Sequence, residues 1–160
     1  MKKKTLICAT FLLVFVGMQV SCKERSEAEE IPFTEYSLAE TSCYWTNIDI
    51  DYEYTSFNRE EVLIINSNET LKNYVNCTID NYPEINFDKY SLIAAWGIAN
   101  NGISNIGKQV MQTGNGLYVF NVVIELNQAE VMTEWQVAVL VDKLPDNAKI
   151  ALSAKIISPY

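Results

Sequence analysis

Four carboxylates between Asp49 and Glu60 have the spacing of a calcium-binding loop. Asp49, Asp51, Glu53 and Glu60 occupy positions 1, 3, 5 and 12 of a twelve-residue segment. Calcium loops use this spacing because a hard cation prefers several oxygen ligands, at ~2.4 Å, from one tight loop. Position 6, where the sharp turn of such a loop requires glycine, is Tyr54. We therefore expect a solvated row of carboxylates on a strand edge rather than a metal site.

Aromatic side chains are concentrated in the same part of the chain. Six of them lie within 22 residues: Tyr36, Tyr44, Trp45, Tyr52, Tyr54 and Phe57. On loops, such rings anchor protein partners or stack on sugar faces. Our candidate partner-binding residues are Trp45, Tyr52, Tyr54 and Phe57. The alternative is that the group is half of a core, because neighbours such as Tyr44 and Trp45 point to opposite faces of a strand.

Histidine is absent from the chain, which excludes several common catalytic sites. A Ser-His-Asp triad, a Cys-His dyad and an imidazole metal site all need this side chain. An enzyme would have to use carboxylates, and Glu125, Glu130 and Glu134 are the candidates for an acid pair that cleaves glycosides. Because surface glutamates are common, we expect no catalytic residues and no cofactor.

Residues 1–21 have the composition of a signal peptide. Three lysines precede an apolar run, Leu6–Val20, which is shorter than the ~20 residues of a membrane-spanning helix. Ser21 and Cys22 follow, and then a charged segment. This order resembles the signal of bacterial lipoproteins, although Gln19 stands where that motif usually has leucine.

The resemblance implies that Cys22 carries a lipid, such as palmitate, and anchors the protein in the outer membrane, on its periplasmic or its surface face. Residues 22–32 would then be a flexible tether. Cleavage near Ser21 without lipidation is the alternative. Loss of residues 1–21 removes three lysines and changes the net charge from −8 to −11, a charge that repels nucleic acid. We expect a lipid anchor and a protein partner, and no nucleic acid.

Two cysteines are left for the folded domain, because Cys8 lies in the signal peptide and Cys22 is assigned to the lipid. Cys43 and Cys77 would be in an exported compartment that permits disulfides. Closing the loop between them would remove roughly 3–4 kcal/mol of chain entropy from the unfolded state. We predict a Cys43–Cys77 disulfide, with two buried thiols as the alternative.

The hydrophobic pattern after residue 32 is mostly period two and predicts one globular β-rich domain over residues 33–160. The predicted fold class is α+β, with a mostly antiparallel sheet or sandwich of about six to seven strands and one short helix. The predicted strands lie within 36–48 and at 61–65, 90–98, 103–112, 117–126, 134–142 and 148–157.

Local signals place the helix and the turns. Asn66 followed by Glu69 predicts the start of a helix of about two turns, with Leu71, Tyr74 and Val75 on one face. Asn-Gly chemistry at residues 100–102 and 113–116 predicts two hairpins.

The last three predicted strands alternate apolar and polar residues, so that one face of each belongs to the core. These faces carry Tyr118, Phe120, Val122, Ile124 and Leu126; Trp135, Val137, Val139 and Val141; and Ile150, Leu152, Ala154 and Ile156.

The chain contains the strings Val62–Glu69, Tyr82–Lys89 and Ser91–Ile93, followed by Trp135 and Pro145. Together these residues resemble an uncharacterised family of short Bacteroidetes lipoproteins. The order of helix, buried strand and hairpins is more distantly similar to the C-terminal domain of protease-complex subunits. That family has Gly-Gly-Tyr where this chain has residues 114–118 (GNGLY), and it implies partner binding rather than catalysis.

We therefore expect an exported, membrane-anchored lipoprotein that acts as a non-catalytic binding or interaction module. One alternative is a protease-associated or protease-inhibitory subunit. Another is a glycan-binding or carboxylate-dependent glycan-cleaving protein. If the aromatic stretch is not the binding surface, the turns at Asn101 and Asn115 are the next candidates.

Overall fold

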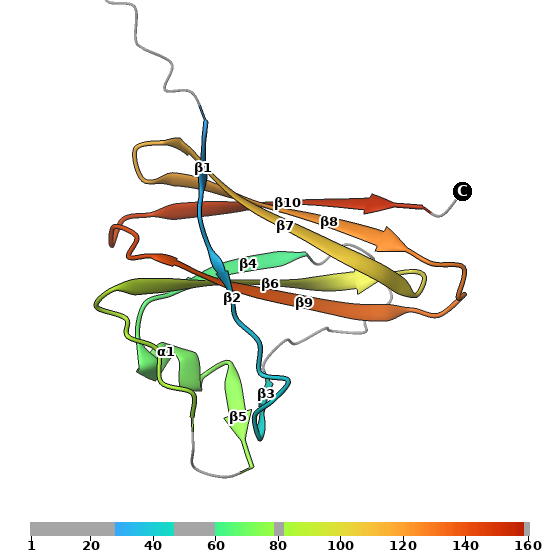
Figure 1. Ribbon diagram of the computed structural model, residues 1–160, viewed down its shortest axis with the longest axis horizontal. Coiled ribbons are helices and arrows are strands. Elements are labelled where there is room, and N and C mark those ends of the chain that lie inside the picture. Colours follow the sequence, from blue (N-terminus) through green and yellow to red (C-terminus); the bar gives the residue numbers. More distant parts are fainter. Residues whose placement is uncertain (1–27, 47–59, 79–81, 159–160) are drawn as a thin grey trace, which may run out of the picture.

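The computed structural model describes residues 28–46, 60–78 and 82–158, which form ten strands and one short helix (Figure 1). The predicted class, a mostly antiparallel β fold with a short helix, is confirmed, and eight of the ten strands form two packed sheets as in a sandwich. The predicted number of six to seven strands is wrong. Four of the ten strands have only two or three residues, too few to show a periodic pattern.

The first sheet has the strand order β1-β7-β8-β10. Its strands are β1 (Glu29–Ile31), β7 (Ile103–Gly114), β8 (Leu117–Leu126) and β10 (Lys149–Ile157). β7 is antiparallel to both β1 and β8, whereas β10 runs parallel to β8 and forms one edge of the sheet.

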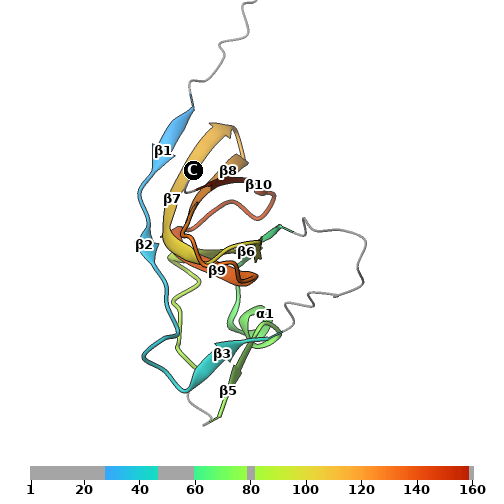
Figure 2. The same cartoon turned by 90° about the vertical axis from the view of Figure 1, so that its right-hand side faces the viewer.

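The second sheet has the order β2-β9-β6-β4 and is antiparallel throughout. Its strands are β2 (Thr34–Glu35), β9 (Thr133–Asp142), β6 (Tyr90–Ala99) and β4 (Glu61–Ile65). Since β1 and β2 are consecutive in the chain, this one segment passes from an edge of the first sheet to an edge of the second (Figure 2).

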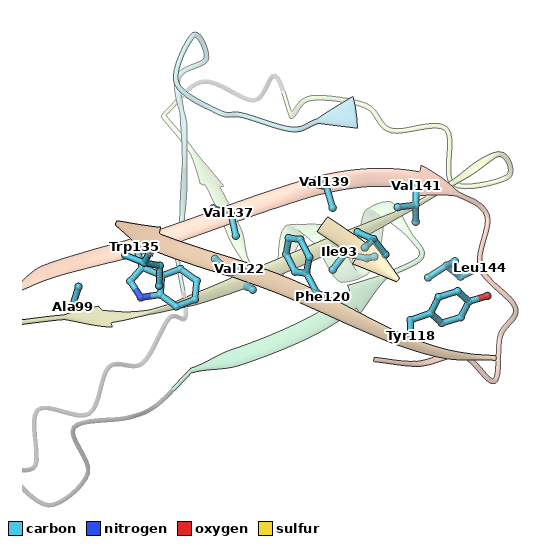
Figure 3. Packing of buried hydrophobic residues seen from close by; sticks show 13 residues of the cluster. Ile93, Ala99, Tyr118, Phe120, Val122, Trp135, Val137, Val139, Val141 and Leu144 are labelled. Atoms are coloured by element: carbon cyan, nitrogen blue, oxygen red, sulfur yellow. The ribbon is translucent and has the colours of Figure 1, made fainter. Parts of the chain in front are cut away.

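The main core lies between the two sheets (Figure 3). The faces predicted for β8 and β9 are confirmed, because Phe120, Val122, Val139 and their alternating neighbours are buried there. The predicted face of β10 packs against the same core but is only half-buried, and its last member, Ile156, is exposed.

A third layer covers the other face of the second sheet. It consists of β3 (Cys43–Trp45), β5 (Val75–Cys77) and α1 (Asn68–Lys72), and it encloses a second group of buried residues (Figure 1). β6 therefore contributes to both cores, with Ile93 on one side and Leu92 on the other. Burial on both faces explains why this strand is a nearly uninterrupted apolar run.

The turn at residues 100–102 does not form the predicted hairpin. It connects β6 to β7, and these strands belong to different sheets. Gly102 accepts a hydrogen bond from Asn127 N (2.7 Å) and donates one to Ala129 O (2.8 Å), and a Cβ at this position would collide with the Asn127 side chain. The second predicted hairpin is confirmed, since β7 and β8 pair across a turn in which Gly116 has φ +70°.

The helix is shorter than predicted and begins one residue later. Ser67, rather than Asn66, is the N-cap, because its side chain accepts a hydrogen bond from Thr70 N (3.1 Å). Helix α1 has five residues, and Val75, expected on its face, belongs to β5.

Residues 29–31, which the sequence placed in the tether, form β1 and pair with residues 110–112 of β7. Ile31 packs against the main core. None of the helices in the described ranges is long and apolar enough to cross a membrane.

Candidate binding surface

Only one of the four possible calcium ligands lies in the described part of the chain. Glu60 immediately precedes β4, whereas Asp49, Asp51 and Glu53 lie outside the described residues. Within residues 28–46, 60–78 and 82–158, no three His, Cys, Asp or Glu side chains are grouped so that they could hold a metal ion.

The aromatic stretch contributes to the second core where it is described. Trp45 is half-buried, and its ring makes an edge-to-face contact with Tyr36, with 6.4 Å between ring centroids and 80° between ring planes. Tyr44 points the other way and is exposed, with its hydroxyl accepting a hydrogen bond from Asn76 Nδ2 (3.0 Å). Two neighbouring rings thus face opposite sides of β3, as the alternative interpretation predicted.

The other three candidate partner-binding residues, Tyr52, Tyr54 and Phe57, lie outside the described residues, as does the lipidation candidate Cys22. Their roles stay predictions.

The hydroxyl of Tyr36 is an unusual group in this region. Its oxygen is buried and has no hydrogen-bond partner among the described residues. Burial raises the pKa of Tyr36 to about 12, because the phenolate would lose its hydration. The ring therefore stays uncharged at neutral pH and acts as a packing element.

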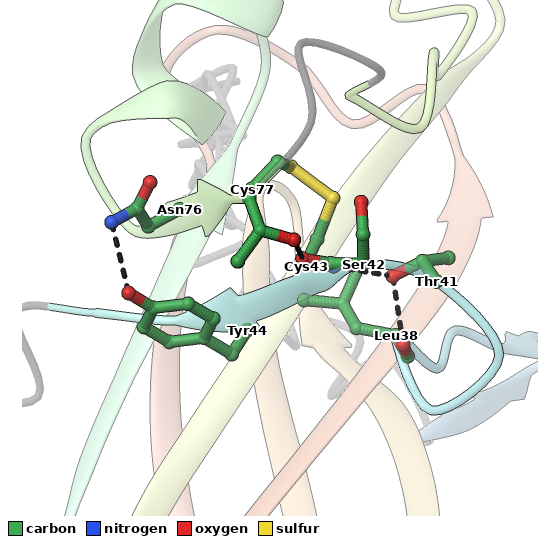
Figure 4. Close-up of a disulfide and its surroundings, with 8 residues drawn as sticks. Leu38, Thr41, Ser42, Cys43, Tyr44, Asn76 and Cys77 are labelled. Atoms are coloured by element: carbon green, nitrogen blue, oxygen red, sulfur yellow. Dashed lines mark hydrogen bonds between the residues drawn. A yellow bond between two sulfur atoms is a disulfide. The ribbon is translucent and has the colours of Figure 1, made fainter.

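The predicted disulfide joins Cys43 of β3 to Cys77 of β5 (Figure 4). The two residues are direct cross-strand partners, with Cα atoms 3.9 Å apart. Next to them Thr78 N donates to Ser42 O (3.1 Å), so the cysteines occupy the non-hydrogen-bonded position, where side chains of paired strands are closest. A two-stranded ribbon is marginal by itself. The disulfide therefore stabilises the layer that covers the second core.

The three glutamates considered for glycoside cleavage do not line a described cleft. Glu125, Glu130 and Glu134 are all exposed. Glu125 lies at the end of β8 and Glu134 at the start of β9, which are strands of different sheets. A glycosidase needs its two carboxyl groups on either side of one bound sugar bond. None of the three lines the polar cleft beside α1.

A shallow polar cleft of about 520 Å³ lies beside α1, where β4 ends. It is lined by Asn66, Ser67, Asn68, Glu69, Ile85, Asn86, Phe87, Asp88 and Lys143.

One polar side chain of this cleft, Asn66, already forms hydrogen bonds that stabilise the fold. The amide oxygen of Asn66 accepts hydrogen bonds from Ser91 Oγ (2.5 Å) and Lys143 Nζ (3.4 Å). Ser91 is fully buried and also accepts a bond from Leu144 N (3.0 Å). This network connects the residue that follows β4 with β6 and with the β9–β10 loop. These polar residues therefore have hydrogen-bond partners within the fold and do not require a ligand.

Exposed apolar side chains lie on two segments at the same end of the sandwich. Of the seven large hydrophobic residues that are exposed in the described ranges, four lie here, with 39–54% of each accessible: Val131, Met132, Ile156 and Ile157. We call this group the apolar end. β10 finishes beside the last residues of β8, with Ile157 opposite Glu125, and the loop of residues 127–132 starts one residue beyond β8 (Figure 1).

Hydrogen bonds to the β6–β7 turn hold this loop in place. Besides the two backbone bonds with Gly102, Asn127 Nδ2 donates to Ile103 O (3.3 Å), and Ala129 N donates to Asn127 Oδ1 (2.9 Å). Val131 and Met132 are therefore presented on a supported loop. The sequence analysis did not select them, although two apolar residues between Glu130 and Glu134 in a polar loop are a signal of exposure.

β10 also leaves one edge open. Its nine residues pair with β8 on one side, and none of the strands described here pairs with its other side. β4 contacts β10 across the sandwich, but it belongs to the second sheet and has only five residues.

Comparisons of the chain with protein-family models, with curated proteins and with solved structures give no significant match. The resemblances to Bacteroidetes lipoproteins and to protease-complex subunits therefore stay predictions.

Proposed function

We propose that this protein is an exported lipoprotein, anchored to the outer membrane through Cys22, which binds a protein partner through its apolar end and has no catalytic role. The observation that carries the proposal is that Val131, Met132, Ile156 and Ile157 are exposed on two segments that lie at the same end of the sandwich. Soluble domains rarely leave large apolar groups together in water, and such groups mark interaction surfaces.

Two features of the apolar end support binding to a protein. Its loop is fixed by hydrogen bonds to the β6–β7 turn, so little conformational entropy would be lost on binding. Methionine and branched aliphatic side chains suit a protein surface better than a sugar, which is usually held by aromatic rings and polar groups. A protease-associated or inhibitory subunit would be a special case of this function.

The glycan alternative depends on carboxylates and on an aromatic ring for which the described structure shows no sugar-binding cleft. Glu125, Glu130 and Glu134 are exposed and share no described cleft, and Trp45 is engaged with Tyr36. We therefore rank partner binding above glycan binding or cleavage.

Affinity capture from the native cell envelope tests the proposal. The full chain should recover a specific protein, and Met132→Glu should reduce the recovery roughly 10–100-fold, as expected when a charge replaces an apolar contact worth about 1–3 kcal/mol. Tyr44→Glu is the matched control, because Tyr44 is about as exposed as Met132 but lies in β3, in the third layer and away from the apolar end. Equal recovery by all three proteins, or loss only with Tyr44→Glu, would show that the binding surface lies elsewhere.

A further inference from the structure

We infer that the partner adds a strand to the free edge of β10, and that this strand carries apolar side chains at alternate positions between two acidic residues. The inference rests on the proposed function and specifies the chemistry of the partner.

The backbone of β10 is the first argument. β10 is parallel to β8 from Lys149, opposite Leu117, to Ile157, opposite Glu125, without a shift in register. In a regular strand alternate residues direct their N–H and C=O groups to opposite edges, so about half of these groups point away from β8. An unpaired edge of this kind is a template for a further strand.

The second argument is that β10 lacks most of the devices that protect an edge. It contains no proline, its pairing with β8 has no bulge, and none of its core-facing residues is charged. The other edge strands of the two main sheets, β1, β2 and β4, have three, two and five residues, so β10 is the longest by far.

The side chains of β10 that face the core determine which residues the added strand needs on its inner face. Ile150, Leu152 and Ala154 are only half-buried, and Ile156 is exposed. In a strand next to β10, the residues directly opposite these four would point to the same face. Apolar residues at those positions would cover these side chains and extend the main core.

The side chains of β10 that face away from the core determine which residues the added strand needs on its outer face. Lys149 and Lys155 lie six residues apart on the same face of β10. Neither forms an ion pair with another described residue, and the ion pair found in the described ranges joins Lys108 to Glu35 (2.7 Å). The protein is otherwise acidic, with a net charge of −8. Acidic residues opposite the two lysines would pair with them, whereas basic residues there would be repelled.

The two sets of side chains together give a seven-residue pattern for the added segment. Opposite residues 149–155 of β10, positions 1 and 7 are acidic and positions 2, 4 and 6 are apolar. The pattern is the same in both directions, so a parallel and an antiparallel strand satisfy it equally. Charge complementarity favours such a segment over a second copy of this chain, because antiparallel pairing of two β10 strands about Ser153 would place Lys149 diagonally beside the other copy's Lys155.

Labelled heptapeptides test the inference by fluorescence anisotropy with the full chain. The first has glutamate at positions 1 and 7, valine at 2, 4 and 6, and threonine at 3 and 5; the second has lysine in place of glutamate. We expect the acidic peptide to bind roughly tenfold more tightly than the basic one. Lys155→Glu should reduce or reverse this preference, whereas Lys89→Glu, an exposed lysine in the loop before β6, should leave it unchanged.

Two further peptides separate strand addition from contact by side chains alone. Each is the acidic heptapeptide with N-methyl groups, on odd positions in one and on even positions in the other. Only one of the two sets of N–H groups can face β10, so one peptide should lose binding and the other should keep it.

Four results would overturn the inference. They are no binding of any peptide, equal binding of the acidic and basic peptides, an equal effect of both N-methylated peptides, and a full chain that is a dimer in solution with β10 closed by a second copy. If no peptide binds but envelope capture still depends on Met132, strand addition is wrong and the proposed function stands. If peptides bind as expected but capture does not depend on Met132, the strand site is correct and the apolar end is not the partner surface.

Discussion

Gly97 lies where β6 passes beneath the indole ring of Trp135, and replacing it with alanine should destabilise the protein. A Cβ on residue 97 would lie 2.6 Å from Cζ2 and 2.8 Å from Cε2 of that ring. Carbon atoms in contact are normally about 3.5–4.0 Å apart, so the ring would have to move by about 1 Å. Trp135 is 3% exposed and belongs to the main core, so little free space exists for that movement (Figure 3).

The expected cost follows from two opposing effects. Forcing an extra methyl group into a packed core costs about 1–3 kcal/mol. Replacing glycine with alanine also restricts the unfolded chain, which returns about 0.4–1 kcal/mol. Gly97→Ala should therefore lower the free energy of unfolding by about 1–2 kcal/mol, and the midpoint temperature by about 3–6 °C for a domain of this size.

Gly107→Ala is the matched control for this measurement. Gly107 lies in β7, and its added Cβ would meet the Val123 side chain at 3.6 Å, an ordinary contact distance. Thermal and urea unfolding followed by circular dichroism should show Gly107→Ala to be as stable as the unmodified protein or slightly more stable. If Gly97→Ala is no less stable than Gly107→Ala, the Trp135 ring does not pack closely against the backbone of β6, and the reasoning is refuted.

Three other perturbations have defined outcomes. Replacing Cys43 and Cys77 together with alanine should lower the free energy of unfolding by about 4 kcal/mol, because the disulfide closes a loop over a sequence separation of 34. In urea unfolding the unmodified protein in reductant should match this variant, and an unchanged midpoint would contradict a structural disulfide. Tyr36 should ionise only near pH 12, so its contribution to stability is complete below pH 10, the ordinary pKa of tyrosine, and is lost as the pH rises from 10 to about 12. Tyrosinate absorbance measures this ionisation, with Tyr36→Phe as the control, and an ordinary pKa for Tyr36 in the folded protein would refute the prediction. Cys22→Ala should move the protein from the membrane to the soluble fraction and abolish lipid labelling, whereas membrane retention without label would exclude a lipid anchor.

The sequence allowed good prediction of the strands that are long and pack on the main core. In β8 and β9 every second residue from Tyr118 to Ile124 and from Trp135 to Val141 is apolar, and this period determined which face is buried. β6 was predicted from a continuous apolar run, and its two buried faces give the reason for that run.

The sequence was less informative where pairing depends on distant parts of the chain. Asn-Gly chemistry at residues 100–102 correctly indicated a turn, but a turn does not determine whether the next strand joins the same sheet. Glu29 and Glu30 resemble a solvated linker because they are exposed, and only Ile31 of β1 contacts the core. The spacing of Leu71 and Val75 suggested a longer helix, while pairing of Val75 with Trp45 places it in a strand.

The candidate surface was predicted only in part. Trp45 was selected as a partner-binding residue, but it packs against Tyr36, because only one of two neighbouring rings on a strand can face the solvent. Met132 and the edge of β10 were not selected, since exposure at the end of a sandwich depends on which strands end together. That arrangement is a property of the sheet order and is not visible in a local pattern.

If Cys22 carries a lipid anchor, the pairing of β1 with β7 limits how far the domain can move from that anchor. If Cys22 is lipidated, only seven residue steps separate the lipid from Glu29, the first residue of β1, and a fully extended chain of this length reaches about 25 Å. A tether that continued to residue 32 would reach roughly 33–36 Å, about the diameter of the domain itself. The domain would therefore stay within its own width of the bilayer, and any partner would have to be met at the membrane surface rather than at a distance from it.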